Sequence, residues 1–336
     1  CIPFSLLIKL ECKYSHFTEW KTKLKQITYL ASVGFVTIFN FCILTTITIN
    51  AMKDIIYVLC CLVIVNSCAQ EPMNHVAQIQ EKQILTSKID PEGKTISTRF
   101  FPPKSYFQKK IPKNSYRHYL QNLPLKPFGE YVTYFNGQKK TGNGVYISVI
   151  DLSIGKRDLH QCADAVMRLR AEFLWNEKRY SEIHFNFTNG FRVDYSEWMK
   201  GRRIIVKGNK TYWSNRNAPS NTYNDFWKYL EIIFSYAGTL SLEKELVHQP
   251  IDSLSIGDVF IQGGSPGHAI VVVNTARNEK GEKLFLLAQS YMPAQELQLL
   301  INPREKELSP WYSLRDLQRL ETPEWTFNST DLKRFE

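Results

Sequence analysis

Cys162 and His268 are the residues whose types and setting could support nucleophilic catalysis. Cys162 is the one cysteine after residue 68, and it stands at the start of a stretch with helical periodicity. Free backbone N–H groups and the helix dipole at a helix start favour a thiolate, which is the nucleophilic form of cysteine. The alternative is a buried, unreactive thiol, because free cysteine is among the most buried residue types. A catalytic role therefore requires a base close to Cys162.

His268 is the histidine best placed to be that base. It follows the glycine-rich residues 263–267 (GGSPG) and opens an apolar run, so we expect it at the first position of a strand. There a side chain can face a cleft while its backbone is held rigidly. His160 is only two residues from Cys162, and residues at that spacing point to different sides of a helix. The alternative role for His268 is that of a hydrogen-bonded core histidine.

Gln289 is the residue expected to orient the His268 imidazole. Residues 278–281 (NEKG) predict a turn, and a hairpin around it pairs positions whose numbers sum to about 557 or 559. His268 and Gln289 then share one face, directly opposite or diagonal. The amide can accept from one ring nitrogen and leave the other to face the thiol. If Gln289 only ends its strand and does not contact the imidazole, Ser290 or Tyr291 is the next candidate for orienting His268.

The elements around these residues predict an α+β domain. Apolar side chains recur at helical spacing over residues 158–175 and 223–238, and Ser115 is a plausible N-cap for a short helix over 115–122. Strands are expected at 131–135, 145–150, 259–261, 269–273 and 284–288. Helices followed by an antiparallel sheet favour one domain over residues 96–330, with a large insertion at about 180–250.

The first 68 residues are expected to lie outside this domain. Residues 52–68 combine a charged start, a short apolar core and small residues before Cys68, which is typical of a secretory signal. Their end resembles a bacterial lipobox, which implies that Cys68 is the lipidated first residue of a lipoprotein. Residues 1–51 are then a misplaced start extension, and residues 69–95 a flexible polar tether.

The alternative for the N-terminal region is a transmembrane anchor at residues 27–49, a run long enough to cross a bilayer. Either way, the domain is expected outside the cytoplasm. The formal net charge of +10, from 42 Lys and Arg against 32 Asp and Glu, is spread along the chain. It suits an anionic envelope polymer as a neighbour, and no dense basic run indicates nucleic acid. The 43% hydrophobic and 22% charged residues exclude a wholly disordered or fibrous chain.

The order of these motifs resembles that of the NlpC/P60 and CHAP cysteine peptidases, which are papain-like enzymes. Residues 257–260 (GDVF) and 267–271 (GHAIV) carry this likeness. It implies a papain-like, NlpC/P60-type fold, a helix plus an antiparallel sheet, with Cys162, His268 and Gln289 as the catalytic residues. Residues 161–165 (QCADA) and 288–295 (AQSYMPAQ) are similar to DUF4846, a family of Bacteroidota lipoproteins, and that likeness covers nearly all of residues 95–330.

The resemblance implies a membrane-anchored cell-envelope hydrolase that cleaves an amide in peptidoglycan peptides or a related polymer. The backbone N–H of Cys162 would hold the oxyanion, with Gln161 or Tyr146 as a second contact. Two other functions stay open: an inactive papain-like binding or assembly lipoprotein, and a thioester-forming acyltransferase. We expect a monomer without a cofactor. No metal site is expected, because no His, Cys or Asp cluster has ligand spacing.

Overall fold

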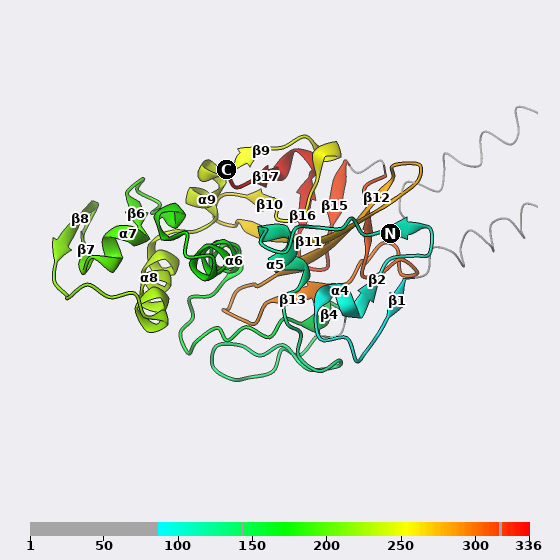
Figure 1. Cartoon of the computed structure of the whole chain (residues 1–336), viewed down its shortest axis with the longest axis horizontal. Coiled ribbons are helices and arrows are strands. Elements are labelled where there is room, and N and C mark those ends of the chain that lie inside the picture. The colour runs from blue at the N-terminus through cyan, green and yellow to red at the C-terminus, as the bar shows by residue number, and fades with distance from the viewer. Residues whose placement is uncertain (1–86, 143, 316–317) are drawn as a thin grey trace, which may run out of the picture. The chain divides into compact units, whose positions relative to one another are not determined.

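The computed structural model describes residues 87–142, 144–315 and 318–336, and a large antiparallel sheet is the centre of this part (Figure 1). The predicted signal at 52–68, the predicted lipidation site Cys68, the predicted extension 1–51 and the alternative span 27–49 lie outside the described residues. Among the helices that the structure describes, none is long and apolar enough to cross a bilayer.

The sheet runs in the order β4–β13–β12–β11–β10–β17–β9, and every neighbouring pair is antiparallel. Two further strands join this sheet: β14 pairs with β12, and β3 pairs with β11. The bounds of the strands are β3 (Tyr106–Phe107), β4 (Tyr146–Val149), β9 (Val247–His248), β10 (Val259–Gln262), β11 (His268–Asn278), β12 (Lys283–Gln289), β13 (Gln298–Leu300), β14 (Tyr312–Ser313) and β17 (Leu332–Arg334). The predicted strands at 145–150, 259–261, 269–273 and 284–288 are confirmed as β4, β10, β11 and β12.

Alternating side chains of β11 build a separate core on each face of the sheet. Ala269 and Val271 belong to the core that includes helix α6 (Cys162–Asn176), whereas Ile270 and Val272 pack in the other core with Phe327. Phe327 lies on β16 (Thr326–Asn328), which pairs with β15 (Arg319–Glu321). Because successive side chains of a strand point to opposite faces, neighbouring residues of β11 serve different cores.

The two long helices begin directly after their N-terminal capping residues. Helix α6 starts at Cys162, because the Asp164 carboxylate accepts a hydrogen bond from the Gln161 backbone N–H at 2.9 Å, so residues 158–161 precede it. The second predicted helix is α8 (Tyr223–Tyr236), where the Thr222 hydroxyl accepts from the Asp225 N–H at 3.2 Å. The short predicted helix is α5 (Tyr116–Gln121), and the Ser115 N-cap is confirmed. Residues that accept from free N–H groups set each start.

The insertion has its own short elements, and its aromatic side chains pack in the same core as α6. The buried Tyr195 ring packs against Phe226 at 5.3 Å and Tyr229 at 5.1 Å between ring centres. Its elements are β5 (His184–Asn186), β6 (Arg192–Asp194), α7 (Tyr195–Met199), β7 (Arg202–Lys207), β8 (Lys210–Asn215), α8 and α9 (Thr239–Glu245). The predicted mixed fold, a large antiparallel sheet with several helices, is confirmed.

Two local predictions need correction. Residues 131–135 form a loop with isolated bridges, Thr133 to Lys139 and Tyr134 to Gln295, because their partners do not continue into a ladder. The tether expected to reach residue 95 ends earlier. Strand β1 (Lys88–Ile89) pairs with β2 (Phe100–Phe101), which follows helix α4 (Ile96–Arg99). The body of the domain therefore includes residues from Lys88 onwards.

Candidate active site

Cys162 lies at the N-terminal end of α6, against the beginning of β11. Three backbone N–H groups, those of Cys162, Ala163 and Ala269, are directed at the Cys162 sulfur. The residue is 7% exposed and borders a cavity of about 240 Å³. This cavity is also lined by Gln161, Thr239, Gly264, Pro266 and Met292. A small ligand group in this cavity would therefore be next to the sulfur.

The thiol is not activated by its position at the helix start. Burial, with a further contribution from the Asp164 carboxylate, raises the pKa of Cys162 to about 11. The three backbone N–H groups lower the pKa, as the helix-start argument requires, but desolvation of a thiolate outweighs them. The sequence-based prediction of a depressed thiol pKa is therefore wrong for this structure.

His268 and Gln289 form the hydrogen bond that the hairpin predicts. His268 Nε2 lies 2.9 Å from Gln289 Oε1, and Gln289 Nε2 donates to Glu324 Oε2 at 2.6 Å. Because a carboxylate only accepts, the amide nitrogen must face Glu324 and the amide oxygen must face the imidazole. Nε2 of a neutral His268 therefore carries the hydrogen, which leaves the lone pair on Nδ1.

A β-bulge sets the register of this pair. Val271 pairs with Ala288 and Val272 with Leu287, so paired numbers sum to 559 near His268, and Gln289 is its diagonal neighbour. Nearer the turn the sum is 560, because the ladder shifts by one residue between Val272 and Asn274. Without the bulge, the ladder would bring Gln289 to the opposite face from His268.

Aromatic rings enclose the imidazole. The ring centre of His268 lies 4.8 Å from Tyr291, 5.4 Å from Trp325 and 5.9 Å from Phe327, and the residue is 1% exposed. Burial lowers the pKa of His268 to about 4; the Gln289 bond opposes this shift, and the positive charge of Lys140 adds to it. The imidazole is therefore neutral near pH 7 and its hydrogen bond is shielded from water.

Lys140 and Glu324 complete the network, and the sequence analysis missed both. Lys140 Nζ lies 2.9 Å from each Glu324 carboxylate oxygen, and the Lys140 side chain is 6% exposed. The ammonium also lies 6.0 Å from the centre of the Tyr291 ring. No spacing rule links the three segments, because Lys140 follows the 131–135 loop, Gln289 ends β12 and Glu324 precedes β16. Only their meeting in the fold identifies them.

Cys162 and His268 lie on different faces of the sheet. Cys162 belongs to α6, on the side of Ala269, whereas the His268 ring packs on the side of Phe327. Among the described residues no hydrogen bond joins the sulfur to the imidazole. Two contacts connect their surroundings. The Ala269 N–H, on the residue after His268, interacts with the sulfur, and the Tyr291 ring packs on His268. Burial, Glu324 and Cys162 raise the pKa of Tyr291.

Gly267 allows the backbone to pass closely just before His268. A Cβ at this position would lie 2.5 Å from the Thr239 hydroxyl oxygen and 2.7 Å from the Gly264 carbonyl oxygen. Both distances are shorter than a real Cβ contact, so a larger residue would displace the loop that leads into β11. The glycine before His268 therefore supports the position of the imidazole.

The two predicted oxyanion contacts have different outcomes. Gln161 borders the cavity beside Cys162, and its amide nitrogen donates to Asp158 at 3.1 Å. Tyr146 is on β4, which β13 and β12 separate from β11, and its hydroxyl accepts from the Val132 N–H at 3.1 Å. Tyr146 therefore does not belong to this site, because the sheet order places its strand beyond the neighbours of β11.

The remaining candidates have structural contacts. The Ser290 hydroxyl donates to carbonyl groups of His160 and Gln295, at 2.9 and 2.7 Å. His160 is buried, packs edge-on to Phe234, and burial lowers its pKa to about 3. Within the described ranges, no group of three or more His, Cys, Asp or Glu side chains is arranged to hold a metal ion.

Comparison with known proteins gives a match to one family. The model of the family described as "Domain of unknown function (4846)", DUF4846, matches residues 96–334. No curated protein and no solved structure matches the chain.

Proposed function

This chain belongs to the DUF4846 family, and we propose that it is a papain-like cysteine hydrolase of the cell envelope that cleaves an amide bond. Cys162 is the nucleophile, His268 the base and Gln289 the orienting residue. The observation that carries this proposal is the bond from His268 Nε2 to Gln289 Oε1, with Glu324 holding the amide. Because Nε2 carries the hydrogen in this bond, Nδ1 is the basic atom of His268. The next residue is Ala269, whose N–H interacts with the Cys162 sulfur.

The reaction starts from a neutral thiol and a neutral imidazole. Nδ1 of His268 takes the thiol proton while the sulfur attacks the carbonyl carbon, and Gln289 Oε1 stabilises the imidazolium through Nε2–H. The Cys162 backbone N–H donates to the developing oxyanion. His268 then protonates the leaving amine as the C–N bond breaks. Water, deprotonated by the same nitrogen, hydrolyses the thioester and restores the thiol.

Burial disfavours a thiolate at Cys162 alone and an imidazolium at His268 alone. Proton transfer from Cys162 to His268, however, forms both charges at once, and they have opposite signs. The raised pKa of Cys162 and the lowered pKa of His268 both have desolvation as their main cause. A thiolate and an imidazolium formed side by side attract each other strongly in a water-poor site. A substrate that fills the 240 Å³ cavity would exclude the remaining water and strengthen this attraction.

The proposed substrate is an amide of a peptidoglycan peptide or a related envelope polymer. The support is the likeness to the NlpC/P60 and CHAP peptidases in residues 257–260 and 267–271, and the lipobox-like end of residues 52–68. Lipidation of Cys68 would hold the domain at the membrane, facing the periplasm or the cell surface. The net charge of +10 suits a polymer that carries carboxylates.

The direct test is incubation of the full-length protein with purified muropeptides, followed by mass spectrometry of the products. Hydrolysis yields a new amine and a new carboxylate, and prior treatment with iodoacetamide abolishes it. If added glycine appears in the product as a new amide, the protein is the acyltransferase rather than the hydrolase. If muropeptides stay intact, the proposed hydrolysis of muropeptides is wrong.

The second candidate is a binding lipoprotein that does not react. The 7% exposure of Cys162 and its pKa of about 11 favour it, because a thiol with this pKa is ionised in roughly one molecule in ten thousand near pH 7. In that case muropeptides would bind to the protein without being cleaved, which equilibrium dialysis would detect.

The Asp164→Asn variant tests the origin of the thiol pKa. Because the carboxylate raises the pKa of Cys162, its removal should lower that pKa and increase the thiolate fraction at any pH below it. The measurement is the rate of iodoacetamide labelling from neutral pH to above pH 11. The midpoint of the variant should lie below that of the wild type. Asp151→Asn, an exposed site, is the matched control and should leave it unchanged; a midpoint that stays or rises in Asp164→Asn would contradict the assignment.

A further inference from the structure

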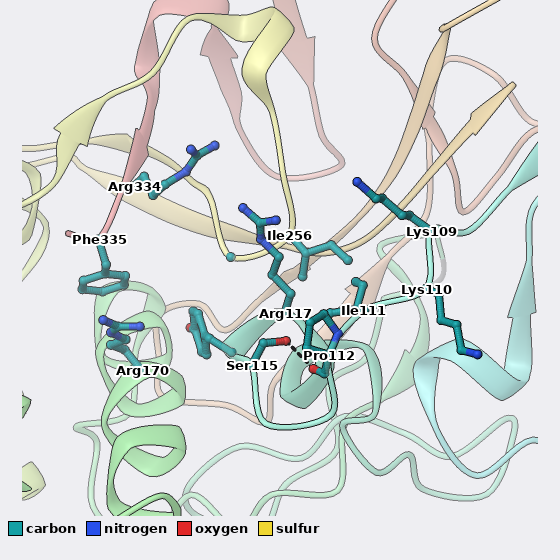
Figure 2. Close-up of a pocket in the computed structure, with 12 residues that line it drawn as sticks. Lys109, Lys110, Ile111, Pro112, Ser115, Arg117, Arg170, Ile256, Arg334 and Phe335 are labelled. Carbon is teal, nitrogen blue, oxygen red and sulfur yellow. Dashed lines mark hydrogen bonds between the residues drawn. The ribbon is translucent and has the colours of Figure 1, made fainter. Parts of the chain in front are cut away.

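A second cavity, far along α6 from Cys162, is surrounded by positive charge (Figure 2). Its volume is about 410 Å³, which is within the usual range for small-molecule sites. Figure 2 shows cationic side chains from three separate parts of the chain around it, namely Lys109, Lys110, Arg117, Arg170 and Arg334. No acidic side chain is among the residues that line it. We call this cavity the cationic pocket.

Only one of these five cations forms a salt bridge with a side-chain carboxylate in the described part of the chain. Arg334 binds both oxygens of the buried Asp258, at 2.5 and 2.8 Å, and so forms a wall of the cationic pocket. Lys109, Lys110 and Arg117 form no ion pair with the described residues, whereas Arg170 donates to a main-chain oxygen of Glu336 and lies near the Glu182 carboxylate. Three positive charges, those of Lys109, Lys110 and Arg117, therefore remain around the cavity without a counter-charge from this part of the chain.

Arg170 is the most informative of these cations, because it is half-buried. Its guanidinium lies 5.4 Å from the Tyr116 ring centre and 5.6 Å from that of Phe335, and it donates to a main-chain carboxyl oxygen of Glu336 at 3.1 Å. Burial lowers the pKa of Arg170 below its ordinary value. The Glu182 carboxylate opposes this shift but does not overcome the effect of burial. A further anion in the cavity would therefore stabilise the half-buried guanidinium.

We infer that the cationic pocket binds a ligand that carries phosphate groups. Guanidinium groups bind phosphate oxygens in a bidentate manner, and lysine ammonium groups add point charges. A phosphate monoester carries close to two negative charges, so it balances these cations better than a carboxylate with one. The Ile111 and Ile256 side chains and the Tyr116 and Phe335 rings give the cavity an apolar wall for the rest of the ligand. This inference goes beyond the proposed hydrolase and does not depend on it.

The test is isothermal titration calorimetry on the full-length protein with three probes. Inorganic phosphate and pyrophosphate represent soluble ligands, and dibutyryl phosphatidic acid, a short-chain lipid, represents a membrane headgroup. Saturable binding of pyrophosphate or of the lipid is expected. The probe with the lower Kd shows whether the natural phosphate group belongs to a soluble ligand or to a lipid headgroup. Acetate at the same concentration should not bind measurably.

The Lys110→Gln/Arg117→Gln double variant should weaken this binding roughly tenfold or more, since it removes two charge-assisted contacts. Both residues are exposed, so the fold should be retained. The matched control is Lys207→Gln/Arg216→Gln. It lowers the net charge by the same amount as the test variant, but the exposed cations that it removes lie outside the cationic pocket. Equal weakening in both double variants, or no saturable binding of any phosphate probe, would overturn the inference. Because the readout is binding, the result is independent of Cys162 chemistry.

Discussion

Cys162→Ala is expected to reduce kcat/KM for amide hydrolysis by roughly a thousandfold or more, because no thioester can form without the sulfur. The substitution removes one buried atom next to a cavity, so only a small loss of stability should accompany it. The measurement is the rate at which the new amine appears from a purified muropeptide, at substrate concentrations below KM.

The control for this prediction is Ser214→Ala, a similar deletion of one polar atom on β8 of the insertion. It should leave the rate within about twofold of the wild type, as expected for a surface change outside the site. Thermal unfolding of both variants shows whether the fold is retained. Full activity in a folded Cys162→Ala protein would refute the nucleophile assignment, and with it the hydrolase mechanism proposed for this site.

Loss of the amide network should have the second largest effect. Gln289→Ala is expected to lower kcat by roughly a hundredfold, because the imidazole loses the group that sets its tautomer and stabilises its charge. Glu324→Gln should have a smaller effect in the same direction. Without a carboxylate partner, the Gln289 amide can rotate and present its nitrogen to His268, which selects the hydrogen on Nδ1.

Lys140→Met is the matched variant for this network, because it removes the cation while the Glu324–Gln289 bond stays possible. The readout is the His268 tautomer, measured by nitrogen NMR of labelled protein. Glu324→Gln should shift the tautomer toward Nδ1–H, whereas Lys140→Met should keep Nε2–H. Since the Lys140 charge lowers the pKa of His268, Lys140→Met should also raise that pKa from about 4. Identical tautomer spectra for both variants would show that Glu324 does not orient the amide.

The proposed catalytic pair and its proposed orienting residue illustrate what local patterns can predict. Cys162 at the start of a helix, His268 at the start of a strand and Gln289 on the following strand all have the positions expected. Helical periodicity, capping residues and turn residues act over a few positions, so they are readable in the sequence. The hairpin itself followed from its turn, which is only a few residues long. Next to the turn the paired numbers sum to 560, however, so His268 and Gln289 share a face only because of the bulge.

Other features depend on contacts between distant segments. The short strands β9, β13 and β17 have two or three residues each, too few for alternation to show, and they join the sheet only through their partners. Tyr146 looked suitable as an oxyanion contact, yet its strand lies three places from β11. The Val272–Asn274 bulge, which places Gln289 on the face of His268, also has no separate signature in the residues around it.

For this chain, the amino-acid order alone was enough to identify the α+β class, the main helices and strands, and three residues suited to cysteine chemistry. The environment of those residues required the folded chain. Solvent exclusion raises the pKa of Cys162 and lowers that of His268, and it outweighs the local effect of the helix start. Lys140, Glu324 and the cationic pocket arise in the same way, because burial and charge pairing depend on which remote segments meet, and no local pattern records that.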